Sequence, residues 1–488
     1  MKTVMDASLY PDMQEIKTWL EELNGFGPRY TGNAAHKQSV DWFQAELEKL
    51  GLAVSRDRHF FTRWEAKSWG LSIMNEAGSF EAVPVTLYYP YSGETPADGV
   101  TGELVYCGKG SANAFQKAAG KIAVVEVANP KLPSRLLFSA RSAYPAAAAK
   151  TPTFIMNPLL GAVLRGPKLE EAHKAGVLGV ICIWNKFSEP NAKGQFLPFT
   201  TAHQQCPALW VGKDTGKQLK QAALNKAQAR LVLHAEVIPQ DSSDTIYAVL
   251  PGMHKEETIL VNTHTDGPNA CEENGGVGLL AMAKYFSRLP LERRNRSIVF
   301  VFVTGHFQIP QFGVHGQATT RWLRDHPEQW NGEGGHKRAI AGITLEHLGC
   351  KEWRDDRLHE HYSYTGNIEH EFVYTANPAM DRIYLDCVKE RTKVRTTTLR
   401  PKGSLYFGEG QPLYNAKIPT ISLIPTPDYL CAEAEDGFMD RLDLNLMMEQ
   451  IETFTQVAAT LDASPAEELG ATEAPAFSVL ELFVKTEQ

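Results

Sequence analysis

The chain has 488 residues, a length that predicts two or three domains. Its 43% hydrophobic and 22% charged residues are ordinary for a globular protein, and a net charge of −8 without a dense basic tract excludes a typical nucleic-acid-binding protein. The first ten residues lack the apolar core of a signal peptide, and no apolar run reaches the about 18 residues that span a bilayer. The seven cysteines are scattered and odd in number, which favours reduced thiols. We therefore expect a cytoplasmic protein that binds neither nucleic acid nor membranes.

Residues 1–95 are expected to form the first part of a domain that residues 241–488 complete. A helix is predicted in SVDWFQAELEKLGL, with Gly51 as its stop and LAVSRD as the following strand. Strand-like alternation continues in SWGLSIM and AVPVTLYY. Arg29, in the loop GPRYTGN, is either a binding residue or, as general grounds favour, a solvated or structural arginine.

Residues 96–240 predict an inserted, mostly β module. Short apolar strands are indicated in TGELVYCGKG, GKIAVVEV and GVLGVICIW, and a helix in KLEEAHKAG leads into the third. The region from residue 129 to 165 is rich in proline and alanine and is expected to form loops. An exit strand is expected in VLHAEVIPQ.

Residues 241–488 predict a second α/β series in which polar side chains follow apolar strands. The strands are expected in TIYAVLPG, ETILVNTHTDG, RSIVFVFVTGH, AIAGITLEHLG and IPTISLIPTPD. The last four end near His264 with Glu272, His306, Glu346, and the segment 428–436. Sites in open α/β sheets form outside the carboxyl ends of the strands, and these are zinc-compatible residue types, so we expect the side chains to converge. An amphipathic helix follows in LDLNLMMEQIETFTQVAATL, and a short strand or helix in FSVLELFV.

The stretch from residue 257 to 286 predicts a strand, a polar turn and a buried helix in succession. His264 and Asp266 stand where the strand ends, and Glu272 and Glu273 precede Gly-Gly and the helix. A metal-binding imidazole needs a carboxylate or carbonyl on its other nitrogen to fix its tautomer. We therefore expect Asp266 to act as the partner of His264.

This set of elements resembles the co-catalytic zinc exopeptidase family that includes aminopeptidase Y and the bacterial zinc leucyl aminopeptidases. The resemblance covers roughly residues 15–460 and is most specific at His-x-Asp, the carboxylate pair and Gly-Gly. It implies an α/β fold, with a mixed, largely parallel sheet covered by helices on both faces. The insert resembles a mostly-β protease-associated domain.

The resemblance also implies a ligand set. His264 and Glu346 match ligands of the first zinc, and Glu272 matches the carboxylate that bridges both zincs. His306 stands at a ligand position of the second zinc, beside Gly305, where the family has its catalytic glutamate. The last ligand, usually a histidine, falls on Leu430 or Cys431 in DYLCAEAED, and Cys431 is either a zinc thiolate or an ordinary buried thiol.

The expected chemistry is therefore hydrolysis of an amide or peptide bond by metal-activated water, with an altered general base. Glu273, His347 and Glu409 are the candidates for that base. One or two zinc ions are expected, with another divalent metal as an alternative. Two rival functions remain open, which are a non-catalytic, receptor-like binding protein and a single-zinc acyltransferase of the glutaminyl-cyclase type.

The substrate is expected to be a small molecule or a short peptide. Residues 307–316 and 350–371 are expected to lie over the site as loops. The insert is compatible with a lid or with the dimerisation surface of a homodimer.

Overall fold

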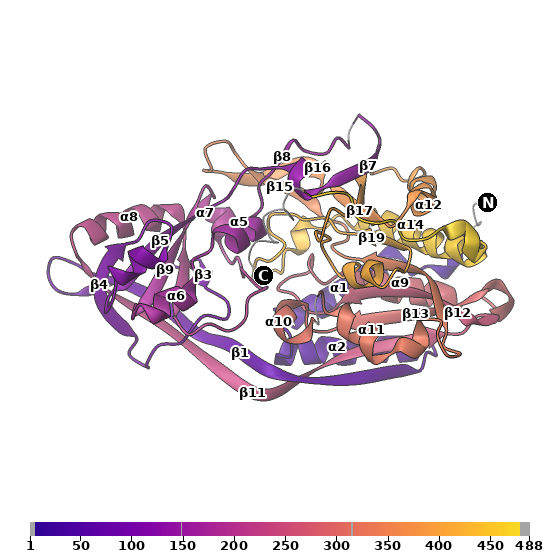
Figure 1. Ribbon diagram of the computed structural model, residues 1–488, viewed down its shortest axis with the longest axis horizontal. Helices are drawn as coiled ribbons and strands as arrows, with labels where there is room; N and C mark the ends of the chain where they lie inside the picture. Colours follow the sequence, from indigo (N-terminus) through magenta and orange to yellow (C-terminus); the bar gives the residue numbers. More distant parts are fainter. Residues whose placement is uncertain (1–4, 148, 314–315, 479–488) are drawn as a thin grey trace.

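The computed structural model describes residues 5–147, 149–313 and 316–478 (Figure 1). Its strands form one long mixed sheet and two short two-stranded sheets. This confirms the predicted fold class, α/β with a large, mostly parallel sheet. No helix in these ranges combines the length and the apolar character that crossing a bilayer requires. All seven cysteines lie in these ranges, buried and without a disulfide.

Four parallel strands form the centre of the sheet beneath the site. They run in the order β13 (Arg296–Val303), β12 (His254–His264), β14 (Arg338–Leu345) and β19 (Thr420–Leu423). Their apolar runs are continuous because both faces of these strands are buried. In β12, Ile259 and Val261 enter the larger core, and Leu260 enters a smaller core on the opposite face. The four carboxyl ends therefore share one edge, as predicted.

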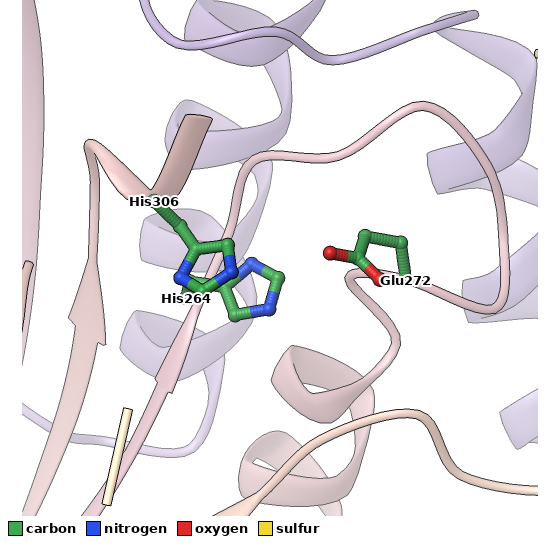
Figure 2. Close-up of side chains that lie close together, drawn as sticks. All are labelled: His264, Glu272 and His306. Atoms are coloured by element: carbon green, nitrogen blue, oxygen red, sulfur yellow. The ribbon is translucent and has the colours of Figure 1, made fainter. Parts of the chain in front are cut away.

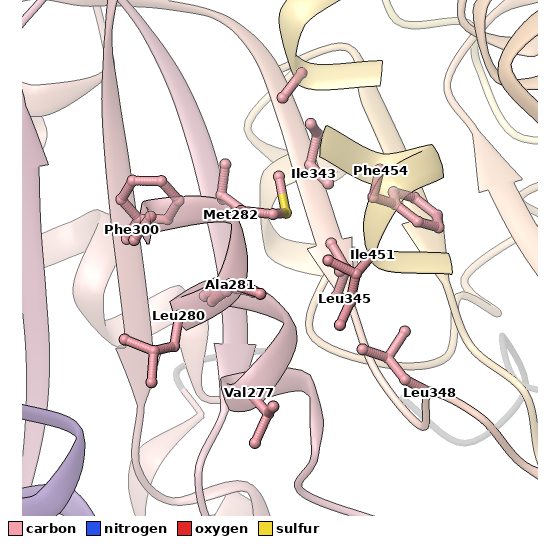
Figure 3. Packing of buried hydrophobic residues seen from close by; sticks show 14 of the residues in the cluster. Val277, Leu280, Ala281, Met282, Phe300, Ile343, Leu345, Leu348, Ile451 and Phe454 are labelled. Atoms are coloured by element: carbon pink, nitrogen blue, oxygen red, sulfur yellow. The ribbon is translucent and has the colours of Figure 1, made fainter. Parts of the chain in front are cut away.

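Helices cover both faces of these strands. The larger core is closed by α9 (Gly275–Ser287) and α14 (Leu444–Ala463), whose side chains interlock with those of β13 and β14 (Figure 3). The predicted C-terminal helix is thereby confirmed, and Met447 is buried in this core. The opposite face is covered by α11 (Thr319–Asp325) and α13 (Gln411–Asn415).

Two N-terminal helices, α1 (Met13–Gly25) and α2 (Ala34–Lys49), complete the larger core. The second is the helix that the sequence predicts. Asn33 caps it by accepting a hydrogen bond from the backbone N–H of His36, at 2.8 Å. Gly51 follows it with a left-handed φ of 80°, the conformation that glycine adopts at least cost.

A long two-stranded ribbon joins this body to the insert, and it corrects the predicted strand boundaries. Its strands are β1 (Val54–Met74) and β11 (Gln228–Leu250), and β2 (Phe80–Val83) pairs with the end of β1. The expected exit strand and the following TIYAVLPG are one strand, because the polar interval between them stays paired with β1, Asp241 opposite Phe61 and Asp244 opposite Arg58. The beginning of β11 pairs with the insert and its end with β13.

The insert alternates strands and helices at the far end of the ribbon (Figure 1). The predicted strands and the helix before the third are confirmed. The strands are β3 (Leu87–Tyr88), β4 (Val100–Tyr106), β5 (Ile122–Ala128), β9 (Gly179–Asn185) and β10 (Ala208–Val211). The helices are α3 (Ala112–Gln116), α6 (Leu169–Lys174), α7 (Glu189–Ala192) and α8 (Lys213–Leu224). Its core also contains Trp64 and Tyr88, from before residue 96. The boundaries at 95/96 and 240/241 stay a prediction.

The region from residue 129 to 165 is more ordered than the loops predicted for it. It contains α4 (Ser134–Leu137), α5 (Pro158–Arg165) and the short strand pair β6 (Leu132–Pro133) and β8 (Phe154–Ile155). Its strand β7 (Ser139–Tyr144) pairs with β18 (Thr396–Arg400) and so becomes the edge strand of the distant main sheet. A long-range pairing of this kind leaves no local sequence signal.

The sequence also misses several elements after β14. Residues 350–371, expected as a loop, contain the hairpin β15 (Lys351–Asp355) and β16 (Tyr362–Ile368). The strand β17 (Glu371–Thr375) and the helix α12 (Pro378–Val388) follow. The predicted element FSVLELFV lies mostly outside the described residues, and the predicted loop 307–316 lies partly outside them.

Candidate metal centre

Three buried side chains from separate elements meet at the shared edge of the sheet (Figure 2). His264 ends β12, His306 follows β13, and Glu272 precedes α9. Their ligand atoms lie within 4.8 Å of one another. A second group, His264 with Glu346 and His347, meets the same limit. The predicted convergence of β12, β13 and β14 at one point is therefore present in the structure.

Two glycines allow α9 to approach the strands closely enough to place Glu272. A Cβ atom on Gly275 would lie 2.2 Å from the carbonyl oxygen of Leu345, and one on Gly276 would lie 2.4 Å from the ring of Phe43. A side chain at Gly275 would push the start of the helix away from the end of β14, and one at Gly276 would push it away from α2, which carries Phe43. The Gly-Gly pair therefore has a packing role at the centre.

His264 presents one nitrogen to the centre. Its Nδ1 lies 2.9 Å from the backbone carbonyl oxygen of Asp266 and must donate to it, so Nε2 carries the free lone pair. Nε2 is buried and has no hydrogen-bond partner among the described residues. Asp266 is thus the partner of His264 as predicted, but through its carbonyl oxygen and not through its carboxylate.

The carboxylate of Asp266 instead fixes the loop that carries His306. It accepts hydrogen bonds from the backbone N–H groups of Gly305, His306 and Phe307, at 3.2, 3.3 and 3.0 Å. It also accepts one from the hydroxyl of Thr31. Asp266 is therefore a positioning residue, and no pattern in the sequence points to the contribution from Thr31.

His306 is held by Glu409, which the sequence suggests as a general base. The Nδ1 of His306 lies 2.7 Å from Oε1 of Glu409. Glu409 also accepts from the backbone N–H and the hydroxyl of Thr319, at 2.8 and 2.7 Å. With these bonds made, Glu409 orients the imidazole and leaves little capacity to serve as a base. Gly408, whose Cβ would lie 2.7 Å from Glu346, lets this loop pass the centre.

Glu346 and His347 follow β14 and point into the centre together. His347 adopts a left-handed φ of 56°, unusual outside glycine, and its Nδ1 donates to the carbonyl oxygen of Pro425 at 2.6 Å. Its Nε2 lies 3.1 Å from Oε2 of Glu272 and 3.8 Å from Oε2 of Glu346. His347, expected as a base, thus has the geometry of a third imidazole ligand.

The electrostatics suit a cation. Burial raises the pKa of Glu346 to about 7, and burial together with the neighbouring His306 lowers the pKa of His264 to about 4. Burial alone would lower the pKa of His306, but the bond to Glu409 and the surrounding carboxylates raise it to about 9. Without a metal, the carboxylates therefore draw positive charge to His306, while His264 stays neutral and able to coordinate.

Four buried atoms of the centre make no regular hydrogen bond among the described residues, and the contact of His347 with Glu272, at 3.1 Å, joins two of them. The four atoms are Nε2 of His264, Oε2 of Glu272, Oε2 of Glu346 and Nε2 of His347. Leaving so many buried polar atoms unsatisfied is costly, and such atoms are rare in folded proteins. Imidazole nitrogens and carboxylate oxygens are ordinary zinc ligands, so this donor set fits a zinc ion.

Two other candidate residues, Glu273 and Cys431, make contacts outside the two ligand groups. Glu273 forms a buried ion pair with Arg29, which also donates to the carbonyl oxygens of Leu23 and Gly27. Arg29 is therefore a structural arginine, as favoured, and Glu273 is its counter-ion. Cys431 belongs to neither ligand group and packs in the core of the insert. Its role as a ligand stays a prediction.

The position expected for the catalytic glutamate is closed by a ring. Gly305 has a φ of 103°, and a Cβ atom there would lie 2.2 Å from the ring of Phe312. Phe312 is 1% exposed and packs edge-on against Phe61, with ring centroids 5.1 Å apart. The chain therefore lacks both the carboxylate and the room for one.

Loops from the insert cover the centre. Phe199 stacks on Phe307 with ring centroids 4.5 Å apart, and its ring lies 5.3 Å from that of His306. The backbone N–H of Phe196 donates to the carbonyl oxygen of Cys431 at 2.8 Å, which ties this loop to the C-terminal loop. These contacts help to bury the imidazole of His306, which is 5% exposed.

Comparison with known proteins supports the fold. A scan against protein families finds no match, and a search of curated proteins finds no relative. Among solved structures, BSAP, a zinc aminopeptidase from Bacillus subtilis, matches with a TM-score of 0.61 and 18% identity over 94% of this chain and 99% of that one. An aminopeptidase from an Aneurinibacillus species matches with a TM-score of 0.57 and 16% identity over 96% and 97%. A peptidase M28 precursor from Shewanella amazonensis matches with a TM-score of 0.61 and 16% identity over 93% of this chain and 95% of that one.

These likenesses show that the chain has the fold of zinc aminopeptidases. At sequence identities of 16 to 18%, the likeness establishes the fold and not the activity. The likeness of the insert to a protease-associated domain stays a prediction.

Proposed function

We propose that this chain is a metal-dependent hydrolase that cleaves an amide-type C–N bond in a small molecule or short peptide. The observation that carries the proposal is the convergence of buried ligand atoms from His264, Glu272, Glu346 and His347, none of which makes a regular hydrogen bond among the described residues. His306 completes the set through its contact with His264, ring centroids 4.1 Å apart. The fold shared with zinc aminopeptidases supports it.

The five side chains would hold one or two zinc ions. Zinc bound there would supply Lewis-acid activation of water and of the scissile carbonyl. The chain's own contribution is to orient the imidazoles, because an acceptor fixes the Nδ1 of each one. The acceptors are the carbonyl oxygen of Asp266 for His264, the carboxylate of Glu409 for His306 and the carbonyl oxygen of Pro425 for His347. The cover formed by Phe199 and Phe307 buries the centre, and burial strengthens its electrostatic interactions.

Proton transfer is the step in which this site differs most from the family that the sequence resembles, because Gly305 stands at the position of that family's catalytic glutamate. Glu273 is engaged by Arg29 and Glu409 by His306, so neither carboxylate is free. His347 is the remaining candidate, since its Nε2 faces Glu272. His347 therefore serves either as a ligand or as the group that takes and returns the proton.

The leading rival is a non-catalytic binding protein on the same fold. One observation favours it, which is that Phe312 fills the space where a base would stand on Gly305. Such a protein has no need to retain a stoichiometric ion.

The deciding experiment is metal analysis of the purified chain beside His264→Ala, His306→Ala and His347→Ala. His173→Ala, an exposed histidine on α6, is the matched control. We expect one or two zinc ions per chain, lost in His264→Ala and retained in the control. No metal in the wild-type chain after incubation with zinc would overturn the proposal in favour of a binding protein.

Activity measurements then separate the two roles of His347. The substrates are dipeptides with free N-termini, aminoacyl anilides and N-acyl amino acids, with product analysis to distinguish hydrolysis from cyclisation. If His347 is a ligand, His347→Ala loses zinc. If it is the base, the variant keeps zinc and loses turnover by about 10²- to 10⁴-fold.

A further inference from the structure

A groove with two adjoining cavities lies between the insert and the main body of the chain, which carries the candidate metal centre. The inner cavity has a volume of about 250 Å³ and the outer one about 790 Å³. Both are lined by Pro28, Trp69 and Glu433. None of these three residues takes part in the metal centre.

Glu433 presents an unused carboxylate oxygen at this junction. The hydroxyls of Tyr30 and Tyr88 both donate to its Oε1, at 2.6 and 3.2 Å. Among the described residues, no hydrogen bond reaches Oε2 and no ion pair includes Glu433. Its backbone is fixed, since the N–H of Glu433 donates to the carbonyl oxygen of Gly194 at 2.8 Å. The carboxylate is thus held in place with one oxygen free.

Aromatic rings surround this carboxylate. Trp69 and Tyr88 meet edge to face with centroids 4.7 Å apart, and Trp64 lies 5.6 Å from Tyr88. Tyr30 stacks on Phe196 at 4.0 Å. All five residues line the inner cavity. Ring faces attract cations, and the attraction grows when the cation is shielded from water.

The other charges of the inner cavity neutralise one another. Arg63 pairs with Glu65, which also lines the cavity, and with Asp241 behind it, and Lys67 and Lys37 supply further positive charge to these two carboxylates. Glu433 is therefore the charge without a partner among the residues that line this cavity. A negative charge among aromatic rings favours a cation over a neutral molecule or an anion.

We propose that the inner cavity is a binding site for an organic cation, a primary ammonium or guanidinium group held by Glu433 and the rings of Trp64, Trp69 and Tyr88. The free Oε2 accepts a charge-assisted hydrogen bond from the ligand, and the rings contact its nonpolar parts. The site is separate from the metal centre, so it does not depend on the proposed hydrolase function.

The cavity nonetheless adjoins the metal centre. Its inner wall includes Thr31, whose hydroxyl donates to Asp266, and Gln308, two residues after His306. If the chain is a hydrolase, this position suits the cationic end of a substrate or product. That extension rests on the proposed function, whereas the binding site does not.

The test is a binding titration of the full chain with n-butylammonium, followed by calorimetry, with 1-butanol as the neutral probe of similar size. It is done on chain dialysed against EDTA and on chain incubated with zinc. Glu433→Gln keeps an oxygen for the two tyrosines and removes the charge. Trp69→Ala removes a ring that is 38% exposed, so it preserves the fold. Glu76→Gln, an exposed glutamate in the turn after β1, is the charge-matched control.

We expect saturable binding of n-butylammonium with or without zinc, weakened at least about tenfold in Glu433→Gln and Trp69→Ala and unchanged in Glu76→Gln. We expect no saturable binding of 1-butanol. Equal binding of the two probes, an equal loss in Glu76→Gln, or no binding at all would overturn the cation site. A chain that fails to bind zinc and still binds n-butylammonium refutes the hydrolase and keeps the cation site.

Discussion

Substituting Gly305 tests whether the chain can accept any side chain at the position of the missing base. Gly305→Ala adds one Cβ atom, which would lie 2.2 to 2.6 Å from three atoms of Phe312. Contacts this short force the ring or the loop to move, at a cost of about 1 to 3 kcal/mol. The φ of 103° adds about 1 to 2 kcal/mol for a residue with a Cβ atom. We expect Gly305→Ala to lower the free energy of unfolding by about 2 to 5 kcal/mol.

Gly51 supplies the matched control. Its φ is 80°, and a Cβ atom there would have nothing within 4 Å, so Gly51→Ala carries the backbone cost without the clash. We expect it to lose about 1 to 2 kcal/mol. The assay is urea denaturation followed by tryptophan fluorescence and by circular dichroism, whose agreement checks that the transition is two-state.

The difference in the free energy of unfolding between the two variants shows whether the space beside Phe312 is closed. If Gly305→Ala is no less stable than Gly51→Ala, the space beside Phe312 is open and the closure of the base position is refuted. The same closure predicts that Gly305→Glu does not raise hydrolytic activity, because its carboxylate has no room at the centre.

Three further outcomes follow from the contacts described above. Zinc at 100 times its dissociation constant should stabilise the chain by about 2.7 kcal/mol, measured as the loss of stability on adding EDTA, and no change would contradict a metal site. Glu409→Gln should weaken zinc binding by about 10- to 100-fold, because His306 loses the charge on its Nδ1 partner, and competition with a chromophoric chelator measures this. The pKa of His326 is raised chiefly by its 2.7 Å bond to Asp57, so this stabilisation is full below pH 6.5 and is lost as pH rises through the raised value. Asp57→Asn should therefore cost about 0.2 to 1 kcal/mol at pH 5.5 and less at pH 9, and an equal loss at both would contradict the pairing.

The sequence predicts the candidate ligands of the centre better than the residues that hold those ligands in place. His264, Glu272, His306 and Glu346 follow apolar strands whose order places their ends on one edge, and that rule holds here. His347 could not be assigned, because its direction depends on a left-handed backbone that only the folded loop reveals.

The residues that hold the candidate ligands in place could not be predicted, because they lie far from those ligands in the sequence. Glu409 lies far along the chain from His306, and its role is marked in the sequence only by the glycines on either side of it. Arg29 and Glu273 are separated by half the length of the chain, and no local pattern joins them. In the same way, β7 belongs to the insert in sequence but pairs with β18 of the main sheet. Residues 139–144 form a strand because of this distant partner, which no local pattern indicates.

The ribbon of β1 and β11 bears on how the chain reaches this structure. Its partners are remote in sequence, Val54 with Ala248 and Ile73 with Ala229, so pairing them in an unfolded chain closes a very long loop. Collapse of the intervening insert brings the ends together and shortens that loop. We therefore expect the insert to fold first and the main body second, so that the insert acts as an internal scaffold for assembly of the distant centre.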